Sequence, residues 1–442
     1  MKSFLIICSL VFAPLFSEAG EPSAHENLPA LIDLALKHNP ELKSSQARWR
    51  MYVGKAKQAG SLDDPMFMFK LQSLLAREPF SFGGKDPQTA KVIGITQQLP
   101  FFGKRALKEE VARYEAESYR WTTEERKLEL KRMLTEAWYQ LYAVDRSLEI
   151  VEKNLRIISD FTAIAESRYT VGQGAQQDIF KAGLEKSKLL DIQISLQQQR
   201  KSIEASINYL ACRPAGTPVG RSADFEIPPF PVSVDQLREL AYEKRPQLKS
   251  LINQVHKGMA SHRLAQKEFW PDFNVSFEYM FREKVVNDMT NDPGYNMFSL
   301  GLTFNIPSQQ EKRQAMLAES ESEKEMAVEE MNGLKNSINY TISDSLAQME
   351  RRRRQAELYR GGIIPQAEQS LESALIGYRV GKVDFLTLLD GRVSLFNYEK
   401  ELYESKAEYM MALARLEAAV GVELVSQGQK KSDSEGMNHV HK

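Results

Sequence analysis

The sequence contains two copies of one order of motifs, and this repeat limits the possible folds more than any other feature. Three pairs of matching positions mark it: Pro40 and Pro246, Pro65 and Pro271, and Gly172 and Gly381. The first two pairs are 206 residues apart (246 minus 40, 271 minus 65), and the third is 209 apart (381 minus 172). Solenoid repeats are only about 20 to 50 residues long. The spacing therefore predicts a duplicated domain whose two halves build one pseudo-symmetric object.

The N-terminus has the pattern of an export signal. Lys2 precedes an apolar run from Phe4 to Phe16, and the small residues Ser17 and Ala19 suit a signal peptidase. We predict a signal peptide at residues 1–19 and an exported mature chain. A membrane anchor is the alternative, but the run is shorter than the ~20 residues that a spanning helix needs.

Composition argues against several classes of protein. The net charge of -1 provides no global field for nucleic acid, and 26% charged residues is too polar for a bundle of membrane helices. We interpret Arg351–Arg354 as a solvated helix face, because no aromatic residues are interleaved with it as in a nucleic-acid site. Cleavage of the signal would leave Cys212 as the single cysteine, so an intramolecular disulfide is excluded, and we expect Cys212 at the buried end of a helix.

Two very long helical hairpins are predicted. Residues 105–168 contain no Gly or Pro, and their apolar positions step by three and four, which is typical of a helix roughly 95 Å long. Residues 310–375 repeat the pattern, with Gly361, Gly362 and Pro365 predicting a bend near position 362. Each long helix ends at a glycine turn and is followed by another helical segment, at residues 176–210 and 385–420.

Four windows alternate apolar and polar residues as amphipathic strands do: residues 66–71, 92–99, 273–281 and 298–304. In an exported chain this pattern indicates the wall of an outer-membrane barrel, because a lipid-exposed strand has one apolar face. Closure needs at least about eight strands, so other copies of the chain would have to complete the barrel. A small soluble sheet at the end of the helices is the alternative that the strand pattern leaves open.

Taken together, these motifs resemble the TolC-like outer-membrane efflux proteins. The resemblance covers about residues 28–424 and rests on the order and spacing of four motifs: the Asn39-Pro40 helix start, the strand end Gln97–Pro100, the turn Tyr169–Gly172 followed by Asp178, and the turn Tyr378–Gly381 followed by Asp390. It implies a mainly α fold with a membrane β-barrel. Three copies would form a homotrimer whose twelve strands build one outer-membrane β-barrel, continued by a long periplasmic α-helical barrel, with each chain internally duplicated.

The expected domain organisation follows the repeat. After the signal peptide at 1–19 come a first repeat at 20–212, an equatorial linker at 213–234 and a second repeat at 235–424. Each repeat consists of a helix, two strands and a long helical hairpin. Residues 425–442 are expected to be a disordered polar tail, and its His439 and His441 are too few to indicate a metal site.

The predicted function is transport and not catalysis. The sequence has no phosphate-binding glycine loop, no metal-ligand spacing and no catalytic Ser/His/Asp set, so we expect no enzyme activity, no cofactor and no bound metal. The resemblance implies an outer-membrane channel of a Gram-negative bacterium, extending into the periplasm as the passive exit duct of a tripartite efflux system. Its partners would be the lipid bilayer, a periplasmic adaptor (a membrane fusion protein) and an inner-membrane pump of the RND type, with no nucleic acid.

The cargo and two rival functions stay open. The stretch Gln97–Arg105 resembles the heavy-metal exporter branch of the family, which indicates small toxic solutes, metal cations among them. The first alternative is the outer-membrane duct of a type I protein secretion system. The second, from a different class, is a periplasmic coiled-coil adaptor or scaffold with a soluble sheet.

The resemblance also implies site residues. Asp178 and Tyr378 would form a closing link between the hairpins, and Asp390 would belong to an acidic ring at the gate, where Thr387 and Val383 replace charged residues of the family. Adaptor-docking tips and a membrane interface are the other two groups. The tips are Val171, Gly172, Gln173, Val380, Gly381 and Lys382, and the interface is Phe101, Phe102, Lys104 and Arg105.

Overall fold

The structure is a computed structural model that describes residues 27–74, 76–77, 88–283 and 294–424. The expected signal peptide (1–19) and polar tail (425–442) lie outside the described residues.

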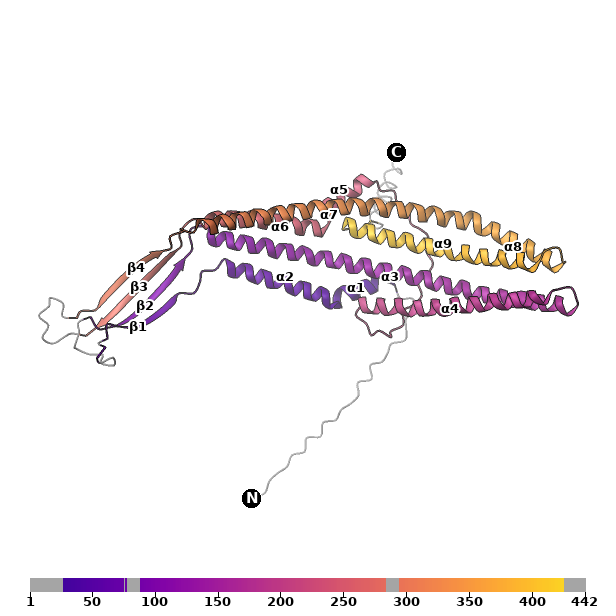
Figure 1. Cartoon of the computed structure of the whole chain (residues 1–442), viewed down its shortest axis with the longest axis horizontal. Coiled ribbons are helices and arrows are strands. Elements are labelled where there is room, and N and C mark those ends of the chain that lie inside the picture. Colours follow the sequence, from indigo (N-terminus) through magenta and orange to yellow (C-terminus); the bar gives the residue numbers. More distant parts are fainter. Residues whose placement is uncertain (1–26, 75, 78–87, 284–293, 425–442) are drawn as a thin grey trace, which may run out of the picture. The chain divides into compact units, whose positions relative to one another are not determined.

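The same order of elements occurs in both halves of the chain (Figure 1). The first half contains α1 (Leu28–His38), α2 (Pro40–Ala59), β1 (Met66–Gln72), β2 (Ala90–Leu99), α3 (Lys104–Thr170) and α4 (Gln176–Leu210). The second contains α5 (Val234–Lys244), α6 (Pro246–Lys267), β3 (Phe273–Arg282), β4 (Met297–Phe304), α7 (Gln310–Leu358), α8 (Ile364–Arg379) and α9 (Phe385–Val420).

Helices α2 and α5 begin at side-chain caps that the sequence encodes. Asn39 accepts a hydrogen bond from the Leu42 amide at 3.1 Å, and Pro40 occupies the first turn of α2, where a missing N–H costs nothing. Ser233 and Gln236 form a capping box at α5, in which each side chain bonds the other residue's backbone amide. Pro40 therefore starts the second helix.

The long helices follow the prediction closely. Helix α3 has 67 residues, which corresponds to about 100 Å. In the second half the α-helix stops at Leu358, and a π-helical turn at Tyr359–Ile363 leads into α8, where Gly361, Gly362 and Pro365 weaken the regular ladder. Among the described residues, no helix is both long and apolar enough to cross a membrane.

The chain divides into two compact units, which are described separately. The hairpin unit comprises residues 27–35, Leu134–Glu226 and Gln355–Ala407. Its core consists of apolar side chains that are at most 2% exposed, among them Leu134, Leu141, Tyr142, Val151, Ile158, Ala182, Phe385 and Leu388. The sheet unit comprises Leu36–Met133, Ile227–Arg354 and residues 408–424. One buried cluster connects four of its helices: Leu237, Ala241, Leu248, Ile338, Ile342, Met349, Tyr409, Leu413 and Leu416.

The sheet unit contains one antiparallel sheet with the strand order β1-β2-β3-β4. Its register is continuous across the four strands: Phe67 pairs with Ile95, Ile95 with Phe277, and Phe277 with Leu300. The outer edges of β1 and β4 have no strand partner among the described residues.

Cys212 differs from the prediction, because it is exposed and not buried. Helix α4 ends in a Schellman turn, in which the Arg213 amide donates to the Asn208 carbonyl (2.8 Å) and the Cys212 amide to the Tyr209 carbonyl (3.2 Å). This turn places Cys212 in the left-handed region with φ 57° and directs it away from the core.

Candidate channel site

The two hairpin tips have the same backbone structure. Gly172 and Gly381 both have φ 75°, a conformation that favours glycine. In the first tip the Gly172 amide donates to the Tyr169 carbonyl (2.9 Å) and the Gln173 amide to the Arg168 carbonyl (2.8 Å). In the second tip the Gly381 amide donates to the Tyr378 carbonyl (3.0 Å) and the Lys382 amide to the Gly377 carbonyl (2.9 Å). Both are therefore Schellman turns, and Val171 and Val380 project from them with 65% and 64% of their surface exposed.

Tyr378 connects the two hairpins of the hairpin unit. Its hydroxyl lies 3.3 Å from Oδ2 of Asp178, and its ring is 2% exposed and packs against Phe385 at 5.4 Å. The guanidinium of Arg168 lies over the ring at 4.6 Å and donates to the Tyr378 carbonyl. Burial, followed by the Asp178 charge, raises the pKa of the Tyr378 phenol, so it is a neutral donor at physiological pH. The structure thus brings Asp178 and Tyr378 together; a gating role for this contact stays a prediction.

The other predicted gate residues lie on the first turns of α9. Asp384 is the N-cap of this helix: its carboxylate accepts the Thr387 amide at 2.9 Å, and hydrogen bonds from Thr387 lower the pKa of Asp384. Thr387 therefore supports the cap instead of supplying charge. Asp390 is exposed and makes no ion pair among the described residues.

A buried charged cluster between α3 and α9 was not anticipated. Arg392 of α9 is 3% exposed and donates from Nε to Oδ1 of Asn154 on α3 at 2.5 Å. Its Nη2 lies 3.6 Å from Glu399, which in turn accepts a hydrogen bond from Lys153 at 2.7 Å. Burial lowers the pKa of Arg392, which reflects the cost of holding this charge away from water.

The spacing of these charges in α9 was a sequence signal that could have revealed the cluster. Arg392, Glu399 and Lys406 are seven residues apart and occupy the stripe that also contains the buried Phe385 and Leu395. Charged residues at heptad spacing on an apolar stripe predict buried polar contacts and not a solvated face.

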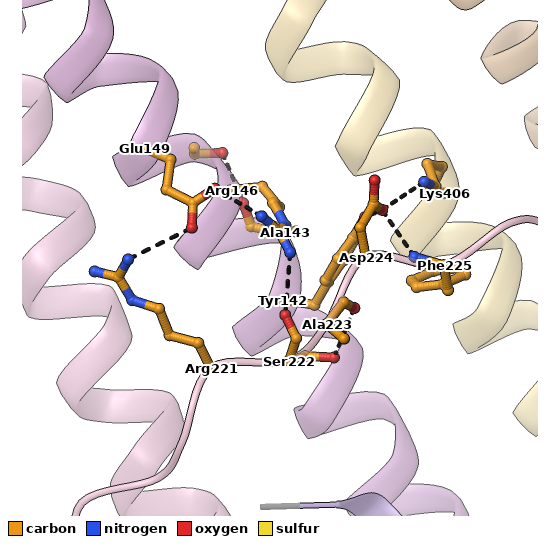
Figure 2. A network of polar contacts seen from close by, with 11 residues as sticks. Tyr142, Ala143, Arg146, Glu149, Arg221, Ser222, Ala223, Asp224, Phe225 and Lys406 are labelled. Atoms are coloured by element: carbon orange, nitrogen blue, oxygen red, sulfur yellow. Dashed lines mark hydrogen bonds and ion pairs between the residues drawn. The ribbon is translucent and has the colours of Figure 1, made fainter. Parts of the chain in front are cut away.

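Part of the predicted linker is fixed to two helices by a second network (Figure 2). Asp224 accepts hydrogen bonds from the Tyr142 hydroxyl of α3 at 2.5 Å and from Lys406 of α9 at 2.6 Å. Burial alone would raise the pKa of Asp224, but the hydrogen bonds from Lys406 and Tyr142 outweigh it and lower the pKa. Nearby, Arg146 donates to the Ser222 carbonyl at 3.2 Å.

A separate set of contacts fixes another part of the linker to α4. Arg200 donates to the Val219 carbonyl at 3.1 Å, and Glu204 accepts the Val219 amide at 3.1 Å. Arg200 also pairs with Asp145 of α3 at 2.6 Å, and burial raises the pKa of Asp145 despite this partner. The linker is therefore held by side chains at two places.

The sheet has one mostly apolar face, on which Lys91 and Gln97 are the polar exceptions, and one mostly polar face. Residues that pair directly across strands share a face. The exposed side chains Phe67, Phe69, Ile95, Val275, Phe277, Phe298, Leu300, Leu302 and Phe304 all lie on one of them. The opposite face contains Lys70, Thr96, Gln98, Asn274, Ser276, Glu278 and Thr303. Such a sheet can separate an apolar medium from water.

The turn between β2 and α3 holds the four predicted interface residues in different environments. Phe101 stacks on Trp270 with ring centroids 5.0 Å apart, whereas Phe102 is 83% exposed. Lys104 differs from the expectation of a cation at a membrane surface, because it is 1% exposed and pairs with Glu268 (3.2 Å) and Asp272 (3.0 Å). Arg105 is exposed.

The described part of the chain contains no group of three or more His, Cys, Asp or Glu residues that could hold a metal ion.

Comparison with known proteins identifies the family. The family model described as outer membrane efflux protein matches residues 31–211 and 237–422, which is most of the chain. The chain therefore belongs to the outer membrane efflux protein family: it is a non-enzymatic efflux channel, located in the outer membrane and extending into the periplasm.

Individual relatives are distant but cover nearly the whole chain. Outer membrane efflux protein BepC of Brucella suis biovar 1 is 21% identical over 407 residues, which is 91% of this chain and 87% of BepC. The crystal structure of the outer membrane protein VceC from Vibrio cholerae has a TM-score of 0.75 at 19% identity and covers 90% of this chain and 96% of VceC. A structure of CusC has a TM-score of 0.74 at 15% identity, with 90% of this chain and 96% of CusC covered. These two similarities establish the fold.

Proposed function

We propose that three copies of this chain form a passive exit duct across the outer membrane. The observation that supports this most directly is the sheet, which has a mostly apolar face and whose outer edges at β1 and β4 have no strand partner among the described residues. A strand edge exposed to lipid leaves backbone groups unsatisfied, at a cost of several kcal/mol each. Four strands cannot close on themselves, whereas three copies provide twelve, which exceeds the minimum of about eight.

The polar face of the sheet would line a water-filled lumen. Gln98, Asn274 and Thr303 form one row across the strands, and Thr96, Ser276 and Gly301 form the next. In the proposed periplasmic part, three copies contribute six long hairpins. The repeated order of elements supports a nearly six-fold tube built from the first repeat (20–212), the linker (213–234) and the second repeat (235–424).

The hairpin tips would form the gate and the docking surface. Asp178 and Tyr378 join the two hairpins of one chain, and three exposed copies of Asp390 would attract cations near the axis. The exposed Val171, Gln173, Val380 and Lys382, with their turn glycines, would meet a periplasmic adaptor. An inner-membrane pump of the RND type would supply the energy, and the cargo would be small toxic solutes, metal cations among them.

The test uses the full chain in its native membrane. We expect a trimer that changes its gel mobility on heating, in the outer-membrane fraction, and discrete conductance steps when it is inserted into a planar bilayer. A monomer without conductance would refute the duct. Asp390→Asn should weaken block by a trivalent cation added from the side of the hairpin tips, while the exposed Asp191→Asn serves as a control.

A further inference from the structure

A pocket of about 520 Å³ lies in the sheet unit where the strands meet α3. Its lining is apolar apart from one charged side chain, Arg105, and includes Leu62, Leu99, Phe102, Phe273 and Leu302. Pockets of about 300 to 1,000 Å³ with apolar walls and few polar groups are typical small-molecule sites.

The pocket is continuous with the apolar face of the sheet. Phe273 pairs with Phe304, and Val275 pairs with Leu302, so the pocket walls belong to the same face as Phe277 and Leu300 further along β3 and β4. A hydrocarbon chain lying along these two strands reaches the pocket without passing a polar side chain.

The wall of the pocket is fixed in place before any ligand arrives. The Phe101 amide donates to Asp272 at 2.8 Å, and the Phe101 ring stacks on Trp270. Lys104 then ties the same turn to Glu268 and Asp272. The charge of Lys104 is therefore satisfied inside the protein and is not available to a ligand.

Arg105, in contrast, is exposed at the rim and has no hydrogen bond or ion pair among the described residues. A guanidinium suits a phosphate group, which it can bind through two parallel N–H donors. An apolar pocket with one unpaired guanidinium at its rim is complementary to a molecule that joins a hydrocarbon chain to a phosphate.

The internal repeat provides a comparison within the chain. Pro100 corresponds to Pro307 at an offset of 207 (307 minus 100), and at the same offset Ser308 and Gln309 replace Phe101 and Phe102. The second half therefore lacks the aromatic wall. The first half therefore supplies the aromatic turn of the pocket, while Phe273, Val275 and Leu302 of the second half supply its strand wall.

We propose that this pocket binds one phospholipid of the outer membrane, with an acyl chain against Phe102, Phe273 and Leu302 and the phosphate beside Arg105. The inference rests on the proposed function, because it takes the apolar face of the sheet to lie in the membrane. It adds a defined lipid site to a surface that otherwise contacts lipid without preference.

The experiment labels the site with a photoactivatable lipid. The full chain, purified in its assembled form, is reconstituted in vesicles of phosphatidylethanolamine and phosphatidylglycerol with a trace of phosphatidylethanolamine that has a diazirine in one acyl chain. After illumination, mass spectrometry locates the adducts. We expect more labelling at Phe102 and Ala106 than at Phe277 and Leu300 on the open face.

Two variants and one control test the chemistry. Arg105→Gln should reduce labelling of the pocket about fivefold, because this is the usual contribution of one basic residue to binding affinity near a lipid surface. Ala106→Trp fills the pocket from an exposed position and should also reduce it. Arg126→Gln, an exposed arginine about 30 Å further along α3, should have no effect.

Several outcomes would overturn the lipid site. These are equal labelling along the whole apolar face, labelling unchanged in Arg105→Gln, and absence of pocket labelling, which would mean that a second copy of the chain covers it. Displacement of the label by inorganic phosphate alone would assign the site to a free anion. Conductance measured on the same samples separates the two proposals: normal conductance without pocket labelling refutes only the lipid site, whereas lack of conductance refutes the duct.

Discussion

Replacing Glu399 by Gln should destabilise α9 locally, around the buried side chain of Arg392. The substitution removes the carboxylate 3.6 Å from Arg392 and leaves a guanidinium that is 3% exposed, with its hydrogen bond to Asn154 and the charge of Glu368 as remaining favourable interactions. Breaking a buried ion pair from one side costs about 3 to 5 kcal/mol. We take the lower value, about 3 kcal/mol, because no hydrogen bond joins Nη2 of Arg392 to Oε2 of Glu399.

Hydrogen exchange measures this effect locally, which matters because the chain consists of two compact units and need not unfold in one step. A loss of about 3 kcal/mol corresponds to roughly a hundredfold loss of amide protection in residues 388–399. The matched control is Lys153→Ala, which removes the other partner of Glu399. The Lys153 side chain is 54% exposed, so we expect about a twofold change or less.

A double variant completes the test. Arg392→Met with Glu399→Met replaces the pair by apolar side chains and should recover most of the lost protection, because exchanging a whole buried pair is often neutral. Protection that falls less than fivefold in Glu399→Gln, or a double variant as unprotected as the single one, would refute the reasoning.

Three further predictions concern the tip, the linker and the helix ends. Tyr378→Phe removes the hydroxyl that reaches Asp178 and should raise the open probability in planar bilayers, whereas Tyr169→Phe at the matching repeat position should not; equal behaviour would refute a gating role. The pKa of Asp224 is lowered in the folded chain, so its stabilising contribution is present above the ordinary pKa of 3.8 and is lost as the pH falls through the lower folded pKa. Limited proteolysis in acid should therefore cut first near residue 224. Asp224→Asn should remove that pH dependence. Cys212→Gly should raise the stability of the hairpin unit by about 0.5 to 1 kcal/mol, because glycine tolerates φ 57°. Gly172→Ala should lower the stability by about 1 kcal/mol, because Gly172 has φ 75°. Thermal melts that show the opposite order would contradict this account.

The sequence predicted the elements well because their periodicity is strong. Helices α4 and α9 have the predicted bounds, and each strand agrees to within two residues. Gly361, Gly362 and Pro365 correctly marked the interruption of the second long helix, since these residues disturb a helical ladder wherever they occur.

Contacts between distant segments were harder to predict. The Asp224 network joins residues 142, 224 and 406, and no local pattern in the linker indicates which helices it meets. No prediction was made for Arg392, although its heptad spacing from Glu399 and Lys406 was visible in the sequence. Cys212 was misjudged because apolar neighbours suggested burial, while the turn that ends α4 reverses the direction of its side chain.

The outer edges of the sheet, which have no strand partner in the described part of the chain, also have a genetic consequence. Under the proposed three-copy assembly, a strand of one chain becomes stable only beside a strand of another, so insertion into the membrane depends on association. A variant with intact strands and a defective hairpin would still join normal chains and impair the tubes that it enters. Such alleles should act as dominant negatives, whereas alleles that disrupt β1 or β4 should be excluded from assembly and behave as recessive losses.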